Sequence, residues 1–195
     1  MKISSSFRKL TFEFISILFA VLLALFLNQC KEDRKNYKLA KQSETLIIDE
    51  MRRNLKDLQD IQQGNQKRLK SFLDWKKRYK KNPKTDYTPL FGFNHALLRD
   101  DGWQSAVLYQ AVPHMRKDFI KNVTEAYSLQ RFYMSYAESY FVSLGNELHS
   151  DESKDVIRIN SAIHQLSTIV KTADLLLKAY QGILDKELSK DKPKK

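Results

Sequence analysis

The chain is poor in the residues that interrupt helices or cross-link small domains. Its 195 residues include one cysteine, five glycines and four prolines. A single cysteine excludes an intramolecular disulfide framework. So few glycines and prolines are unusual in a sheet protein with many turns, whereas Leu, Lys, Ala, Gln and Glu, which dominate the long segments, are good helix formers. These shortages predict an all-α fold.

Signatures of catalysis and metal binding are missing as well. The chain has no G-x-S-x-G nucleophile elbow, no phosphate-binding glycine loop and no H-E-x-x-H pair. Its four histidines are too scattered along the sequence to form a metal site by spacing. The neighbouring Asp100 and Asp101 could serve acid–base chemistry, but helix capping explains them more simply. We therefore expect no enzymatic activity, no metal and no cofactor.

One long apolar run, from Leu10 to Leu27, dominates the N-terminal part of the chain. As a helix rising about 1.5 Å per residue, this run would be roughly 27 Å long, just enough to cross the hydrocarbon core of a bilayer. Residues 1–9 form a short basic tail before it, as in a signal peptide. However, residues 27–30 (LNQC) lack the small side chains that signal cleavage requires. The run therefore predicts an uncleaved transmembrane helix at residues 10–27.

Two polar residues mark the ends of this run. Glu13 is the only ionisable side chain inside it, and a carboxylate in a membrane is costly unless it is neutralised or paired. Glu13 lies one turn from the interface and four residues after Lys9, so it can reach water or pair locally. The alternative is a contact with another span. Asn28, at the other end, joins Glu13 as a candidate intramembrane contact.

The residues after the anchor predict one domain, residues 28–188, followed by a disordered basic tail at residues 189–195. No proline or glycine occurs between the anchor and Gly64, so the membrane helix should continue out of the bilayer. Apolar residues then recur with seven-residue spacing around a polar middle beside Gly64. Either one helix runs to about Lys81, or two helices meet at a bend near Gly64.

The middle of the chain predicts shorter elements. Pro83 to Pro89 should form a loop, and residues 94–98 an irregular stretch or a short helical turn. A helix should begin at Asp100 or Asp101, either of which could cap it, and it should stop before Pro113. A longer helix should follow.

The last predicted helix is the clearest, because an apolar seam recurs along it in three- and four-residue steps. The seam consists of Val156, Ile159, Ile163, Leu166, Val170, Ala173, Leu177, Tyr180 and Leu184. Such a seam predicts packing along the helix that leaves the membrane, in an elongated antiparallel bundle. We therefore predict Ile163, Leu166 and Leu177 as core residues, and Trp103 as a core wedge between helices.

The stretch from Lys67 to Lys84 is strongly basic, with nine Lys or Arg residues against one acid, Asp74. A solvated helix face is the simplest explanation. The interleaved aromatic residues also allow contact with anionic lipid or an acidic protein partner, which we favour over nucleic acid. The candidate contact residues are Lys76, Lys77, Arg78, Lys80 and Lys81.

The opening of the chain contains Glu13, an apolar run to Ala24 and Leu25, then Asn28, Glu32 and Arg34. This order resembles the opening of a family of uncharacterised bacterial single-span membrane proteins. That family shows a Glu, an aliphatic run, Ala-Leu-x-x-Asn-x-Trp, and then charged residues. This chain differs in placing Cys30 where the Trp stands. Trp103 with Ala106, and later Tyr127, is similar to the family's central helices. The resemblance implies an anchored helical domain without catalytic residues.

These patterns favour a non-enzymatic, single-pass membrane protein with a helical interaction or scaffold domain. Its expected partners are membrane lipids and another protein or a second copy. The alternative function is a ligand-sensing helical domain that acts through a membrane partner. Basic residues flank both ends of the apolar run, and counting these charges alone leans slightly toward a cytoplasmic domain. However, short basic N-termini before a span are usually retained in the cytoplasm. This favours placing the domain on the extracytoplasmic side of the cell membrane.

Overall fold

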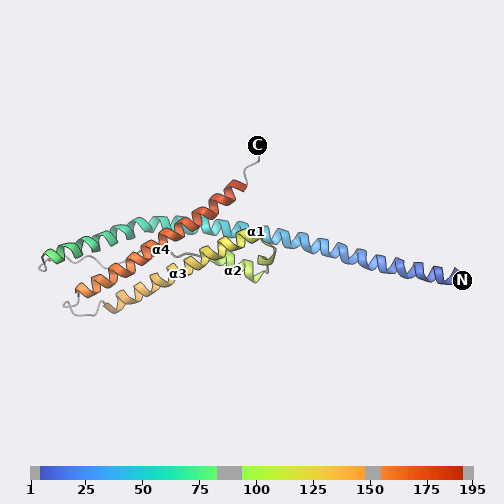
Figure 1. The fold of residues 1–195 in the computed structure, drawn as a ribbon, viewed down its shortest axis with the longest axis horizontal. Coiled ribbons are helices and arrows are strands. Elements are labelled where there is room, and N and C mark those ends of the chain that lie inside the picture. The colour runs from blue at the N-terminus through green and yellow to red at the C-terminus, as the bar shows by residue number, and fades with distance from the viewer. Residues whose placement is uncertain (1–4, 83–93, 148–154, 191–195) are drawn as a thin grey trace.

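The computed structural model describes residues 5–82, 94–147 and 155–190 (Figure 1). In these ranges it contains four α-helices and one short 3-10 helix, and no strand, which confirms the predicted all-α fold. The elements are α1 (Ser5–Lys81), α2 (Asp101–Leu108), η1 (Val112–His114), α3 (Lys117–Glu147) and α4 (Asp155–Lys190).

Helix α1 is a single uninterrupted helix of 77 residues. The chain therefore forms one long helix rather than two helices that meet at a bend near Gly64. A lone glycine costs a helix only about 1 kcal/mol relative to alanine, and no proline lies within α1 to break the hydrogen-bond ladder. Buried neighbours on both sides, Leu58 and Asn65, hold this part of α1 against the rest of the fold.

The two halves of α1 have different surroundings. All side chains from Lys9 to Gln29 are exposed, and Figure 1 shows this part of the helix extending alone, away from the other elements. Packing into the hydrophobic core begins at Leu39 and Ala40. The bundle therefore starts about ten residues later than residue 28, where the sequence placed the start of the domain. We call residues 9–38 the free half of α1 and residues 39–81 the bundle half.

Helices α3 and α4 complete the bundle, and α4 packs against both α1 and α3. Side-chain contacts give the directions: Glu44 of α1 meets Arg116, just before α3, and Glu187 near the end of α4. Farther along, Gln130 of α3 contacts both α1 and α4. Helix α3 thus runs parallel to α1, and α4 runs antiparallel to both.

The buried side of α4 is wider than the predicted seam. Leu166 and most of the seam are buried, while Ile163 and Leu177 are half-buried and pack against the core. The side chain of Val156 lies outside the described part of the chain. A second row of buried residues completes the face, because α4 contacts two helices rather than one. This row consists of Ala162, Ile169, Leu176 and Ile183.

Several predicted boundaries were wrong. Of the two alternatives for residues 94–98, the irregular stretch is confirmed and the helical turn was wrong, because residues 94–100 run in an extended conformation alongside α1. Helix α4 includes Ser189 and Lys190, which were predicted to begin a disordered tail, because its hydrogen-bonded turns continue through Lys190. The predicted loop at residues 83–89 and the tail residues 191–195 lie outside the described residues.

Candidate functional site

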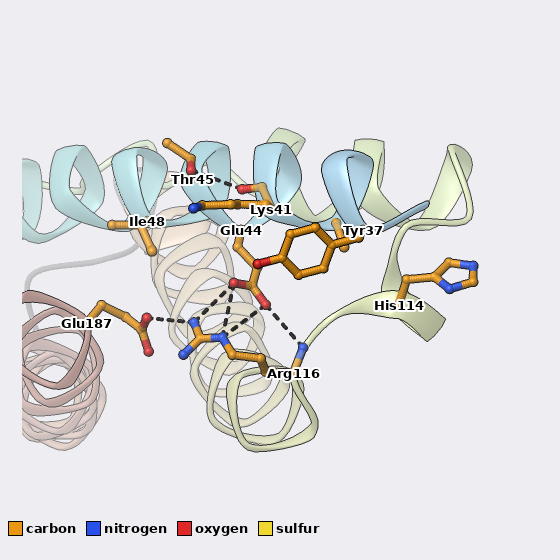
Figure 2. Close-up of a pocket in the computed structure, with 9 residues that line it drawn as sticks. Tyr37, Lys41, Glu44, Thr45, Ile48, His114, Arg116 and Glu187 are labelled. Carbon is orange, nitrogen blue, oxygen red and sulfur yellow. Dashed lines mark hydrogen bonds and ion pairs between the residues drawn. The ribbon is translucent and has the colours of Figure 1, made fainter. Parts of the chain in front are cut away.

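The end of the bundle nearest the free half of α1 contains a cleft of about 290 Å³ (Figure 2). Arg116 lies at its centre. Its guanidinium group contacts Glu44 of α1 at 3.1 Å and Glu187 of α4 at 2.6 Å. The Arg116 backbone N–H also donates to the Glu44 carboxylate at 3.1 Å. One cation therefore joins α1, the start of α3 and the end of α4.

Arg116, Glu44 and Glu187 form a partly buried charged cluster, and this burial determines its electrostatics. Burial alone would lower the pKa of Arg116, but hydrogen bonds and charges from Glu187 and Glu44 raise it above its ordinary value. The guanidinium group is therefore a permanent cation. Lys41 also lines the cleft. The charges of the two basic side chains, Lys41 and Arg116, therefore balance those of the two acidic ones, Glu44 and Glu187. The cleft is consequently polar without a strong preference for ligand charge.

The rim of the cleft adds further polar groups without forming a catalytic arrangement. Tyr37 and His114 are exposed, and Figure 2 shows His114 directed away from the guanidinium group. None of the hydrogen bonds drawn in this cleft joins a nucleophile to a general base. The arrangement suits binding of a ligand, or stabilisation of the contact between the helices, rather than catalysis. In the described ranges, no group of three or more His, Cys, Asp or Glu residues is placed to hold a metal ion.

A second polar cluster lies deeper in the bundle, around Glu50. This side chain is only 2% exposed, although it carries a carboxylate. It accepts a hydrogen bond from the Tyr127 hydroxyl and another from the Gly102 backbone N–H at 2.8 Å. Burial and the bond to Glu50 raise the pKa of Tyr127, so the phenol remains a donor. Glu50 thereby caps the start of α2, where Asp100 or Asp101 was the predicted cap.

The predicted cap was wrong because a different contact satisfies Asp100. The Asp100 carboxylate accepts from the Gln104 side chain at 2.8 Å and makes no hydrogen bond to the backbone at the helix start. The nearby carboxylate on α1 supplies the acceptor instead. The first turn of α2 is therefore fixed by tertiary contact rather than by its own sequence.

Two buried asparagines of α1 bind the backbone of the extended segment 94–100. Asn54 donates to the Arg99 carbonyl at 2.7 Å and accepts from the Arg99 N–H at 3.0 Å. Asn65 pairs with the backbone of Asn94 in the same way, at 2.7 and 3.2 Å. The spacing explains the match, because eleven helical residues and five extended residues both cover about 16.5 Å.

Helix α4 is tied to these side chains as well. Tyr180 donates to the Gln130 side chain, which in turn donates to the Arg99 carbonyl at 3.0 Å. Gln62 donates to the Val170 carbonyl at 2.9 Å and to the Asp174 carboxylate at 2.7 Å. The polar residues near Gly64 therefore form buried hydrogen bonds: Gln62 binds α4, and Asn65 binds the segment 94–100.

Sequence reasoning missed the residues of both clusters. A usable signal existed for Glu50 and Asn54, because both fall in line with the buried Ile47, Met51 and Leu58 at helical spacing. A polar residue at a core position predicts a buried partner. Glu44, Arg116 and Glu187 lie far apart in the sequence and gave no comparable signal.

The structure distributes the predicted site residues over three separate regions. Glu13 and Asn28 are exposed on the free half of α1. Trp103 is half-buried, with its ring centre 6.0 Å from that of Tyr127, and it lines an open cleft of about 700 Å³ beside α2. The basic residues occupy the far end of α1, where all but the half-buried Lys76 are exposed. They are Lys76, Lys77, Arg78, Lys80 and Lys81.

Comparison with known proteins adds no assignment. No family model, curated protein or solved structure matches the chain. The resemblance of its opening residues to a family of single-span membrane proteins therefore remains a prediction. In the described ranges, α1 is the one helix that is long and apolar enough to cross a membrane, judged by length and composition.

Proposed function

We propose that this protein is a non-enzymatic, single-pass membrane protein whose helical bundle acts as an interaction or scaffold module. The observation that carries the proposal is the continuity of α1, whose free half has an exposed apolar surface and whose bundle half forms part of the core. An exposed apolar run of eighteen residues fits lipid much better than water. Because no linker separates the two halves, a rotation or displacement of the bundle would be transmitted directly along α1 to the span.

In this proposal the anchor is not cleaved, and the bundle lies on the extracytoplasmic side of the cell membrane. Alkaline carbonate extraction of membranes should leave the full-length protein in the pellet. Mass spectrometry should then detect Lys31 in the same chain as the apolar run. A soluble protein with a mature N-terminus near Cys30 would overturn the anchor. Labelling of an introduced surface cysteine by an impermeant reagent would test the orientation.

The basic end of α1 is the candidate surface for a protein partner. Lys76 lies 49 residues beyond Leu27, which corresponds to roughly 70 Å along a continuous helix. Electrostatic attraction to the protein's own bilayer is screened within about 10 Å. An acidic partner is therefore a better fit than the lipid surface next to the span.

Cross-linking in intact membranes tests this surface. The comparison is between the native chain and a variant with Lys76, Lys77, Arg78, Lys80 and Lys81 changed to Gln. The same partner should be captured less by the variant, and less at high salt. Equal capture by both forms would return the stretch to a solvated helix face.

A ligand-sensing role is the second candidate, and the cleft around Arg116 favours it. This cleft is formed by three elements that could shift relative to one another when a molecule enters. A small molecule that raises the unfolding temperature of the native protein, but not of Arg116→Gln, would support sensing. Equal stabilisation of both forms would exclude this cleft as the sensing site.

A further inference from the structure

Between Phe12 and Asn28, helix α1 concentrates its polar and small residues on one face. At about 100° per residue, five side chains fall within roughly 120° of the helix circumference. Outside this sector, every position from Phe12 to Phe26 is Phe, Ile, Leu or Val. Ile17 and Leu27 also fall within this sector, but all the polar and small side chains between Phe12 and Asn28 lie in it. These five residues are Glu13, Ser16, Ala20, Ala24 and Asn28.

The polar groups at the two ends of this face have no partner within the described chain. Glu13 and Asn28 are both exposed and make no hydrogen bond or ion pair with another described residue. Both groups lie near an end of the span, where insertion into a bilayer replaces part of their water by lipid, and a polar group that loses water without gaining a partner destabilises the inserted state. A partner that satisfies both ends of the face would remove this cost.

We propose that the partner is the span of a second copy of this chain, an inference that rests on the proposed membrane-spanning role of α1. Two copies inserted with the same topology are parallel, so a two-fold axis brings each residue beside its own counterpart. The Asn28 amide has both a donor and an acceptor and can pair with itself across that axis. At the other end, Lys9 offers each Glu13 a cation from either copy.

The residues between these polar groups permit the close contact that such pairing needs. Ser16, Ala20 and Ala24 recur every four residues, so the two backbones can approach closely, typically with a crossing angle of about 40°. With the crossing near Ala20, the two helix axes would be displaced sideways from each other by about 18 Å at Lys38, some 27 Å beyond the crossing. The basic residues that follow the span would therefore not be pressed together.

The position of the bundle is compatible with this pairing. Buried core residues of α1, such as Ile47 and Leu58, lie roughly 160–180° around the helix from the centre of the polar face. The bundle therefore extends away from the face on which the second copy would sit. The two bundles of a dimer would lie on opposite sides of the paired spans.

Cysteine cross-linking of the full-length protein in native membranes tests the face directly. Cys30 is the sole cysteine, so a Cys30→Ser background leaves only introduced thiols. Ala20→Cys and Ala24→Cys lie on the face, while Leu22→Cys and Leu25→Cys lie on the other side of the helix. We expect at least tenfold more disulfide-linked dimer from the first pair under mild oxidation. Equal or absent cross-linking across all four positions would overturn the inference.

A substitution at Asn28 provides a second, independent measurement. Asn28→Leu should weaken association between labelled copies in liposomes by about 3- to 20-fold, the range found for interhelical hydrogen bonds in membranes. The matched control is Gln29→Leu, which changes an adjacent polar residue on the opposite side of the helix and should have no effect. Equal effects of the two changes would contradict pairing through Asn28.

Carbonate extraction of the same samples separates the two proposals. Protein that is fully extracted from membranes would refute the membrane anchor and, with it, the pairing of spans. Protein that stays inserted but shows no association between labelled copies would refute only the pairing.

Discussion

The two halves of α1 are parts of one helix, but they are stabilised in different ways. The free half exposes nearly every side chain, and its residues 10–27 are apolar around most of the helix circumference. The bundle half buries one side only, and that side includes polar residues such as Glu50, Asn54 and Asn65. The comparison shows that polar groups of the bundle half are buried with specific partners on other elements, whereas residues 9–38 bury no polar group.

The largest expected effect comes from placing the same charge in each half. Leu58→Asp would bury an unpaired carboxylate in the core, at a cost of several kcal/mol, comparable to the stability of a small domain. Leu22→Asp should leave the bundle intact and reduce membrane insertion instead, at about 3 kcal/mol. Thermal unfolding and carbonate extraction measure the two effects separately. A bundle that is destabilised equally by both changes would contradict the distinction.

The buried carboxylate sharpens the comparison at a smaller scale. Tyr127→Phe removes the hydroxyl that donates to Glu50 and should lower the free energy of unfolding by about 1–3 kcal/mol. Tyr109→Phe is the control, because Tyr109 is 65% exposed, and it should change stability by less than about 0.5 kcal/mol. Denaturant unfolding compares them. Similar values for the two variants would show that the buried contact contributes little.

The buried tyrosines also predict how stability depends on alkaline pH. Burial raises the pKa of Tyr133 to about 12, and burial raises the pKa of Tyr180 as well. The folded state therefore keeps protons that the unfolded state releases above its ordinary pKa of about 10. Stability should be complete below about pH 10 and fall as the pH rises from there toward 12, by about 1.4 kcal/mol per unit for each tyrosine.

Urea unfolding between pH 9 and pH 11 would measure this slope. Tyr133→Phe should make it shallower, because one of the protons bound in the folded state is removed. A flat profile, or an unchanged slope in the variant, would contradict burial of the phenol.

The smallest expected effect lies at the junction of the two halves. Arg116→Gln breaks the contacts to Glu44 and Glu187, but the Arg116 side chain is 37% exposed, so the loss should be about 1 kcal/mol. The exposed Arg131→Gln is the control and should be close to neutral. Added salt should reduce the difference between the native protein and Arg116→Gln. A loss unaffected by salt would indicate a packing role for the arginine instead.

The sequence predicted those features that depend on local pattern. Helical spacing identified the α4 seam, including Leu166, and the absence of proline predicted the continuity of α1 before Gly64. It did not predict the second buried row at Ile169 and Leu176, since a periodic pattern does not reveal that a helix touches two neighbours. Nor did it predict that Asn54 and Asn65 bind the extended segment, because their partners are backbone groups that no sequence pattern marks.

The continuity of α1 is the central claim, and a distance between two spin labels tests it most directly. One label sits on the native Cys30 in the free half, and the other on Lys56→Cys, an exposed position in the bundle half. Twenty-six residues of unbroken helix separate their backbones by about 39 Å. The account predicts a narrow distribution near that distance for the membrane-reconstituted protein. A broad distribution, or one centred at a much shorter distance, would show that the helix breaks between the span and the bundle.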